Sequence, residues 1–325
     1  MKGICRLLVF AACCWSLTAA GEQARGGKII SVSEAKTPPV IDGVLDDECW
    51  KTAEAGEDFI PVSALPPERT VIRLAYDRKH LYFGVECFVK DSERMRQQAA
   101  EMRAKAGFTE GFVNISDFAY KWEVELFIDP GATQCNYYQL LMNAGGQICG
   151  QYKGNWNPFA VKPEFKARVH ARGWTGEMIL PVDGMPGVEL KAGDEWGLNV
   201  ARRDMENVVI WKDVGSVYNE PRRFGRMVIG DYRTWWESVW IKGVMVELGR
   251  MAGDMGRFGA KAPYLPAMFA VTQEKAREVN GRAQGIDFSR RSGFVPLYDV
   301  YSLFYGGFHR LDALYRTLGA DAKIW

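Results

Sequence analysis

The sequence predicts a mainly β protein: an antiparallel β-sandwich followed by an α-helical C-terminal extension. Between residues 28 and 230, about nine to eleven short runs of β-branched and aromatic residues alternate with Gly, Pro or Asp turns, a spacing typical of a sandwich. After residue 230, apolar residues recur three and four positions apart, as they do on helices. The predicted organisation is a leader at residues 1–20, a β domain at 21–230 and a helical extension at 231–325.

The first 20 residues resemble a secretory signal peptide. Lys2 and Arg6 supply positive charge, residues 7–17 are apolar, and Thr18-Ala19-Ala20 has the small residues of a cleavage site. A lipoprotein signal is the alternative, because Phe10-Ala11-Ala12-Cys13 loosely resembles a lipidation box. No later apolar run reaches the ~18 residues of a membrane span. The sequence therefore predicts an exported protein in the periplasm, at the cell surface or outside the cell.

The first part of the β domain is predicted to combine strands with two helices. An acidic turn at residues 42–48 opens a short helix that buries Trp50, since acidic side chains favour helix N-termini. Residues 91–106 have helical composition without a breaker, so we expect an exposed helical excursion between strands. The predicted strands here are residues 28–33, 70–76 and 80–89.

Residues 120–152 are predicted to form two strands, a turn and a third strand. Apolar side chains alternate with two carboxylates and a ring along 121–128, so one strand face is apolar and the other carries the carboxylates. The apolar set is Trp122, Val124, Leu126 and Ile128, and the other set is Glu123, Glu125 and Phe127. Asp129-Pro130-Gly131 has turn chemistry, and strands follow at 137–143 and 147–152.

The rest of the chain supplies short strands and then three helices. The predicted strands are residues 165–171, 173–181, 195–202, 208–211 and 226–229. The predicted helices are residues 235–255, 266–284 and 297–318, with breaks at 259–266 and 285–296. Aromatic residues of the extension are expected in its core rather than in a binding stripe; they are Trp235, Trp236, Trp240, Tyr298, Tyr301, Phe304, Tyr305 and Phe308.

Composition restricts the classes of function. Without Lys2 and Arg6, 39 of the 41 basic residues remain against 40 acidic ones, a net charge of −1. Such a chain lacks the basic surface that displaces counterions from nucleic acid. The 11 Trp and 13% aromatic content suit large cores or surfaces on which ligand rings stack. GxSxG, HExxH and phosphate-binding patterns are absent from the sequence, which therefore offers no enzyme signature of its own.

Glu123 and Glu125 are candidate site residues because both project from one face of one strand. Glycoside hydrolysis needs two carboxylates that face each other across a sugar, and these normally come from different elements. Three interpretations stay open at this point. The pair is catalytic, or one carboxylate accepts hydrogen bonds from sugar hydroxyls, or both are simply exposed.

Two further groups of residues allow more than one interpretation. The acids Asp42, Asp46 and Asp47 fit turn and helix-start chemistry, but clustered carboxylates also suit calcium. The cysteines beyond the leader permit two disulfides with three pairings in an exported protein, and their spacing does not predict zinc. They are Cys49, Cys87, Cys135 and Cys149.

Short landmarks follow one another between residues 28 and 230 in a characteristic order and spacing. They are Ile41-Asp42-Gly43 with Trp50, Tyr76-Asp77 with Leu81-Tyr82, residues 124–129, residues 139–143 with Gly145, Gly173-Trp174 with Glu177 and residues 179–181, Gly193-Asp194 with Trp196, Asn199 and Arg202, Trp211, and Pro221 with Phe224-Gly225. Through these landmarks, residues 28–230 resemble family 9 of the carbohydrate-binding modules, in its group of exported bacterial members.

The resemblance implies a β-sandwich that holds a sugar between two aromatic rings and binds calcium structurally. It implies saccharide contacts at Glu125, a hydrogen-bonding acid, and at Asn143, an amide, together with Gln139. Tyr218 matches one ring. The other ring, a Trp in the family, falls near Ala119, so that Phe118 or Tyr120 would replace it. Two further departures are Leu141 in place of an arginine and Trp122 in place of an acid.

The expected function is that of an exported carbohydrate-binding protein, without catalysis of its own, that supports polysaccharide breakdown. One alternative is a glycoside hydrolase acting on O-glycosyl bonds. Another is a haem-binding redox protein, for which Met142 and His170 are the candidate ligands. The helices of residues 231–325 are expected to pack on the sandwich or on one another, and docking of a protein partner is a further possible role for them.

Overall fold

The computed structural model describes residues 28–62, 68–154, 161–204, 207–215, 218–259 and 262–321. The signal sequence expected at residues 1–20 lies outside them. The chain divides into a β unit at residues 28–235 and a helical unit that begins at Trp236; the two are described separately. The last strand ends at Ile229 and the first helix after it begins at Tyr232, beside the boundary expected at residue 230.

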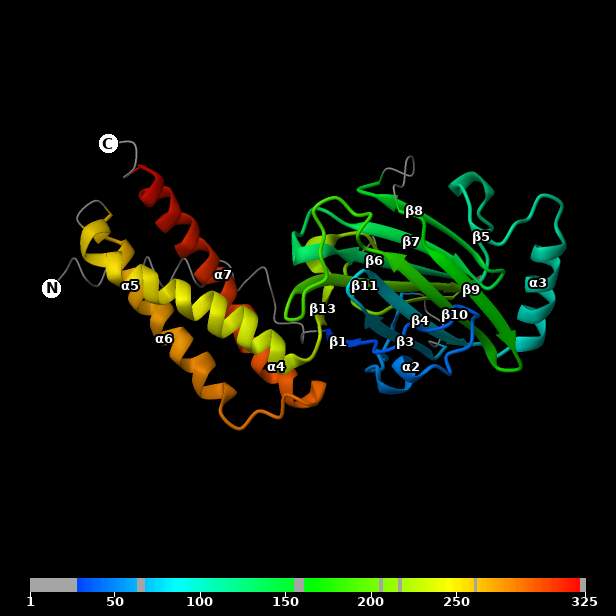
Figure 1. Ribbon diagram of the computed structural model, residues 1–325, viewed down its shortest axis with the longest axis horizontal. Coiled ribbons are helices and arrows are strands. Elements are labelled where there is room, and N and C mark those ends of the chain that lie inside the picture. Colours follow the sequence, from blue (N-terminus) through cyan, green and yellow to red (C-terminus); the bar gives the residue numbers. More distant parts are fainter. Residues whose placement is uncertain are drawn as a thin grey trace. The chain divides into compact units, whose positions relative to one another are not determined.

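Among the described residues, thirteen strands join into one sheet (Figure 1). Its order is β5-β8-β7-β6-β11-β13-β1-β3-β4-β10-β9, and β12 and β2 continue from β11 as a branch. The strands are β1 (Ile29–Glu34), β2 (Ile60–Pro61), β3 (Thr70–Tyr76), β4 (His80–Phe88), β5 (Gly111–Phe112), β6 (Glu123–Asp129), β7 (Tyr138–Asn143), β8 (Gln147–Tyr152), β9 (Glu164–His170), β10 (Gly173–Pro181), β11 (Glu195–Asp204), β12 (Asn207–Ile210) and β13 (Gly225–Ile229). The mainly β prediction is confirmed.

Strand β1 joins the two halves of the sheet. Its first four residues, Ile29 to Val32, pair in parallel with β13, and its last two, Ser33 and Glu34, pair in parallel with β3. Every other neighbouring pair along the sheet is antiparallel except β5 with β8. The ladder is therefore continuous from one half to the other and resembles a barrel that does not close.

Both halves of the sheet contribute to one core. Leu126 of β6 and Val200 of β11 belong to the same buried cluster as Leu74 of β3 and Phe83 of β4. Strand alternation supplies these side chains, because every second residue faces inward. The predicted apolar face of residues 122–128 is confirmed, since Trp122 is 5% exposed and belongs to this cluster.

A buried carboxylate fixes the short helix α2 (Glu48–Thr52). Glu177 of β10 is 0% exposed, and its Oε2 accepts hydrogen bonds from the backbone N–H groups of residues 42, 43 and 44 at 3.0, 2.8 and 3.1 Å. Its Oε1 accepts one from Trp50 Nε1 at 2.7 Å. One carboxylate thus satisfies four donors and ties the acidic turn to β10.

The helix α3 (Ser92–Ala104) lies where a helix was expected, but it is not a fully exposed excursion. Met95 and Ala99 are buried in the main core, and Gln98 Oε1 accepts a hydrogen bond from Trp122 Nε1 at 3.0 Å. The sequence pattern concealed this contact because α3 buries a narrow stripe of small and flexible side chains among charged neighbours.

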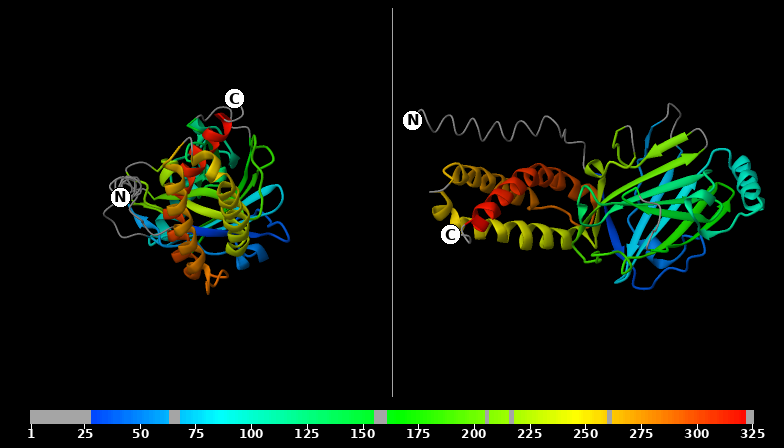
Figure 2. Two further views of the ribbon diagram at one scale, coloured as in Figure 1. Left: turned by 90° about the vertical axis from the view of Figure 1, so that its left-hand side faces the viewer. Right: turned by 90° about the horizontal axis from the view of Figure 1, so that it is seen from above.

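The helical unit contains three long helical segments that run side by side (Figure 2). Helix α4 (Tyr232–Trp235) leads into the π-helix η4 (Trp236–Met245) and then α5 (Val246–Gly259), followed by α6 (Leu265–Ala283) and α7 (Arg291–Asp321). Trp240 stacks on Trp236 with ring centroids 5.3 Å apart and donates from Nε1 to Asn280 Oδ1 at 2.7 Å. Of the eight aromatic residues expected in the core of the extension, seven are buried, and Tyr305 is 43% exposed.

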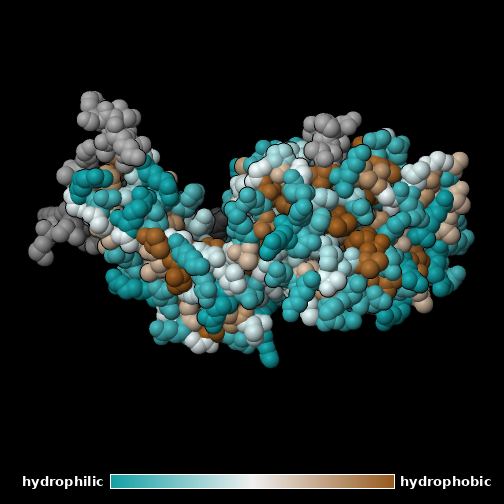
Figure 3. Space-filling model, in the orientation of Figure 1, coloured by the Kyte–Doolittle hydropathy of each residue, from teal (hydrophilic) through white to brown (hydrophobic). Residues whose placement is uncertain are grey.

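The break expected at residues 285–296 was too long. Helix α7 already begins at Arg291 and contains Pro296. A proline within the first two turns removes only one hydrogen bond near the helix start, where several N–H groups lack helical partners. Over the described residues no helix is both long and apolar enough to cross a membrane, and the face shown in Figure 3 is largely hydrophilic with scattered apolar patches.

The expected disulfides are absent from the described residues, where the four cysteines are free thiols. Cys87 lies in the main core, Cys49 packs beside Trp50, and Cys149 packs in a third cluster with Leu141. Cys135 is exposed. The four thiols lie in four different places in the fold, so their even number does not mean that they form disulfide pairs.

Candidate functional site

A polar face of the sheet lies opposite the core. Along β6, Val124 and Leu126 face the core, so Glu123 and Glu125 project from the other side. Antiparallel pairing places Glu123 beside Arg203 of β11 and beside Asn143 of β7. We call the set Glu123, Glu125, Gln139, Gln151 and Arg203 the polar face; its members come from four adjacent strands.

Arg203 is the cation of the polar face. Its Nη1 lies 3.3 Å from Glu123 Oε1 and its Nη2 lies 3.5 Å from Glu125 Oε1, so a single guanidinium pairs with both carboxylates. The Arg203 side chain is 43% exposed, whereas those of Glu123 and Glu125 are 1% and 8% exposed. The guanidinium therefore lies between the two acids and the solvent.

Arg203 was not among the predicted site residues. The sequence contains the signal, because alternation places Arg202 and Arg203 on opposite faces of one strand. Arg202 is 1% exposed and donates to Glu68, Thr70 and two backbone carbonyls. Only the register between β6 and β11 shows that Arg203 meets the acids. The family resemblance implied an arginine at position 141, where this chain has Leu141, and Arg203 supplies a guanidinium to the site instead.

Glu123 is buried without hydrogen bonds. Neither of its carboxylate oxygens accepts one from any residue that the structure describes. Burial raises its pKa to about 7; Arg203 opposes that rise, while the charges of Glu125 and Asp204 add to it. The interpretation of Glu123 as a simply exposed acid is wrong, because Arg203 and the neighbouring strands cover its carboxylate.

Glu125 is held by an amide relay. Gln139 Nε2 donates to Glu125 Oε2 at 2.7 Å, and the Gln139 carbonyl oxygen accepts a hydrogen bond from Gln151 Nε2. Burial raises the Glu125 pKa, and Arg203 and the Gln139 hydrogen bond both oppose the rise. The structure thus brings together two of the predicted residues, Glu125 and Gln139, and adds Gln151, which the sequence reasoning missed.

Two tyrosines belong to the same region. Burial raises the pKa of both Tyr120 and Tyr218, and the charges of Glu125 and Arg203 act on both hydroxyl groups. Tyr120 is 54% exposed, and Tyr218 is half-buried against the cluster of Phe127, Tyr137 and Phe224. Phe118, the other candidate at this position, is 5% exposed and packs beneath Tyr120 at 5.2 Å between ring centroids.

Asn143 lies on the predicted strand face, but its side-chain amide already makes hydrogen bonds within the protein. Its Oδ1 accepts from the backbone N–H groups of Gly145 and Gln147 at 3.0 and 3.1 Å. Its Nδ2 donates to Ala119 O and to Gln147 Oε1 at 2.9 and 3.1 Å. With 0% exposure, this amide positions the β7–β8 turn and the segment that carries Tyr120. Its predicted direct contact with saccharide stays a prediction.

The acids predicted to bind calcium do not form a ligand set. Asp42 Oδ1 accepts from Val44 N at 2.8 Å and Asp47 Oδ2 accepts from Val40 N at 3.1 Å, so both carboxylates accept hydrogen bonds from the backbone of the acidic turn and the segment before it. In the described ranges no three His, Cys, Asp or Glu side chains, Asp46 included, gather as ligands of one ion would. The calcium expectation stays a prediction, and these carboxylates do not fit it.

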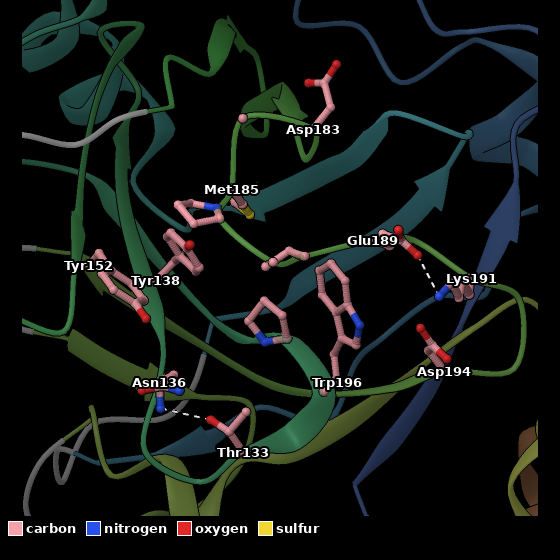
Figure 4. Close-up of a pocket in the computed structure, with 16 residues that line it drawn as sticks. Thr133, Asn136, Tyr138, Tyr152, Asp183, Met185, Glu189, Lys191, Asp194 and Trp196 are labelled. Carbon is pink, nitrogen blue, oxygen red and sulfur yellow. Dashed lines mark hydrogen bonds and ion pairs between the residues drawn. The ribbon is translucent and has the colours of Figure 1, made fainter.

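Apart from the polar face, a depression of about 810 Å³ lies between the turn after β6 and the segment at residues 183–196 (Figure 4). Tyr138 and Tyr152 lie in its wall with ring centroids 4.6 Å apart, so the rings cover one another. Glu189 pairs with Lys191 at 2.5 Å. The wall therefore offers a ligand fewer free aromatic faces and acceptors than its composition suggests.

No protein-family model matches the chain, and no curated protein matches it. Solved structures do. A family 9 carbohydrate-binding module from Caldicellulosiruptor kristjanssonii, in complexes with cellotriose and with glucose, is 17% identical at a TM-score of 0.45; each alignment covers 62% of this chain and 94% or 95% of the module. A Bacteroides uniformis protein proposed to bind carbohydrate is 13% identical at a TM-score of 0.47, over 62% and 99%.

Proposed function

We propose that this chain is a saccharide-binding protein and that the polar face, with Tyr120 and Tyr218, is its binding site. One observation carries the proposal: two acids, an oriented amide and a guanidinium on one sheet face lie within the electrostatic reach of two tyrosines. Sugars present apolar C–H faces together with hydroxyl groups, so they suit rings beside acceptors and donors.

The sequence landmarks support the same assignment. In this proposal the two halves of the sheet correspond to the layers of a family 9 sandwich, Tyr218 is one stacking ring, and Tyr120 is the second. Glu125 accepts from sugar hydroxyls, and Gln139 holds it in place. Export and a role in polysaccharide breakdown belong to the proposal through the pattern of residues 1–20 and the family resemblance. Docking of a partner by the helical unit stays a prediction.

The geometry favours binding over hydrolysis. Glycosidases place their two carboxylates on either side of a sugar, whereas Glu123 and Glu125 lie on the same strand face and pair with one guanidinium. The haem alternative has less support, because Met142 is 0% exposed in the apolar core and His170 lies on the outermost strand β9.

Calorimetry with the full chain tests this proposal. We expect a neutral gluco- or xylo-oligosaccharide to bind, and both Tyr120→Ala and Tyr218→Ala to weaken binding. Tyr264→Ala, at a 46% exposed tyrosine of the helical unit, is the matched control and should leave affinity unchanged. Absence of binding across a broad glycan array would overturn the proposal, and sugar release from the same oligomers would favour the hydrolase.

A further inference from the structure

On this side of the sheet, more buried acceptors than buried donors lack a hydrogen-bond partner among the described residues. Glu123 contributes two carboxylate oxygens that accept no hydrogen bond from the described residues, and Gln151 contributes an amide oxygen in the same condition. Asn199 Nδ2 is the unmatched donor on this strand face. Unmatched buried acceptors are costly unless a donor arrives from outside. The face is therefore complementary to a ligand group that donates several hydrogen bonds.

The charge of the polar face is also unbalanced. Glu123 and Glu125 share Arg203, so two carboxylates face one cation. The adjacent cluster repeats this excess, since Glu68 and Asp204 share Arg202. The Asp204 charge reaches Glu123 and adds to the rise of its pKa. Arg202 and Asp204 project from the opposite side of β11, so the excess on the polar face itself is that of Glu123 and Glu125 over Arg203, and a cationic ligand group would favour the ionised form of both acids.

We propose, resting on the proposed saccharide site, that this site prefers saccharides that carry a free amino group. An ammonium is a compact cation with three donors. Placed beside Arg203, it would give the two carboxylates two cations and supply donors to the unmatched oxygens of Glu123. Arg203 makes no hydrogen bond to either acid in the part of the chain that the structure describes, so its exposed guanidinium shifts towards Glu125 without breaking one.

The other charged class of sugar is disfavoured. A uronic acid would meet Arg203 first, but its carboxylate would become a third acidic group around one guanidinium and would oppose ionisation of Glu123 and Glu125. Burial of like charges without compensation is unfavourable. We therefore expect amino-sugar oligomers to bind best, neutral oligomers less well and uronic acid oligomers weakest.

Calorimetry at pH 7 and constant salt tests this order, with oligomers of glucosamine, N-acetylglucosamine, glucose and galacturonate at matched length. We expect the glucosamine oligomer to bind at least about tenfold more tightly than the glucose oligomer, which corresponds to ~1.4 kcal/mol. Acetylation removes the charge and should abolish this difference. Putrescine, a simple diamine, should bind much more weakly than the glucosamine oligomer, since it has no sugar ring to stack on Tyr120 and Tyr218.

Variants separate this inference from its premise. Glu123→Gln should weaken binding of both oligomers and bring their affinity ratio close to one. Glu93→Gln, at an 80% exposed acid of α3, should leave the ratio unchanged. Glu125→Gln is the second variant if Glu123→Gln does not fold by circular dichroism. Neutral and amino oligomers that bind equally well would overturn the inference alone, as would a ratio that survives Glu123→Gln or putrescine that binds equally tightly. Failure of every saccharide to bind would overturn the proposed function as well.

Discussion

The side chain of Gln139 donates a hydrogen bond of 2.7 Å from Nε2 to Oε2 of Glu125, linking β7 to β6 across the polar face. The Gln139 carbonyl oxygen is in turn held by Gln151 of β8. Because an amide whose oxygen is already occupied has a fixed orientation, Glu125 is presented in one rotamer. Side chains from three neighbouring strands thus hold one hydrogen-bond acceptor, the Glu125 carboxylate, in position.

Replacing Gln139 by Leu should disturb the site without removing any charge. We expect the saccharide affinity to fall about tenfold, since a hydrogen bond to a charged group contributes ~1.5–3 kcal/mol. The Glu125 pKa should rise further, because a group that opposes the rise is lost. Calorimetry gives the affinity, and carboxyl carbon NMR across a pH titration gives the pKa. Unchanged values of both would show that the relay does not position Glu125.

Tyr218 should contribute through its ring. Tyr218→Ala is expected to weaken saccharide binding by about 1–3 kcal/mol, by analogy with base stacking on aromatic side chains. Tyr218→Phe keeps the ring and should retain most of the affinity. If Tyr218→Phe loses as much saccharide affinity as Tyr218→Ala, the hydroxyl group and not the ring makes the contact.

Glu177 should matter for stability rather than for binding. Its carboxylate accepts from three backbone N–H groups and from Trp50 Nε1. Glu177→Gln presents an amide NH₂ to one of these donors, and we expect a loss of about 1–3 kcal/mol in the free energy of unfolding. Urea unfolding measures it, with Glu189→Gln, at a 70% exposed acid, as control. An effect no larger than that of the control would contradict this role.

The β unit should lose stability as pH rises from about 5 to 8. Burial raises the folded-state pKa of Glu123 and Glu177 to about 7 and that of Asp204 to about 6, above the ~4 of unfolded carboxyls. In that window the folded state binds more protons than the unfolded state, so the stability present at low pH is lost as these groups ionise. Urea unfolding at several pH values should show this decline, and Glu123→Gln should flatten it.

Thiol reactivity should distinguish one cysteine from three. Burial raises the pKa of Cys49 to about 11 and the pKa values of Cys87 and Cys149 to about 12, and thiolates are the reactive form. Only Cys135 of these four is exposed. Among these four, we expect rapid native alkylation only at Cys135, located by peptide mapping, and alkylation of all four in urea. A disulfide-linked peptide pair from the oxidised protein would contradict the free-thiol state.

Much of the fold could be predicted because it depends on local patterns. The alternation from Trp122 to Ile128 correctly separated the core face from the acid face, and turn residues such as Asp129-Pro130-Gly131 marked where β6 ends. The expected start of the last helix, at residue 297, is wrong because Pro296 is not a break. Helix α7 begins at Arg291 and tolerates Pro296 because this proline lies near the helix start.

The site was harder to predict because it depends on long-range register. Arg203 lies 80 positions after Glu123 in the sequence, and only the pairing of β11 with β6 brings them together. Asn143 illustrates the reverse error, in which a polar residue on the correct face is used by the turn beside it. Sequence patterns show which face a side chain occupies, but they do not show which partner it finds there.

The double pairing of β1 has a consequence for biogenesis. This strand is the first of the β unit to leave the ribosome, yet its first four residues pair with β13, which is synthesised almost 200 residues later. Contacts of such long sequence separation form late and slowly. Completion of the ladder therefore has to wait until nearly the whole unit has been made, so a partly synthesised β unit cannot close the pairing of its own first strand.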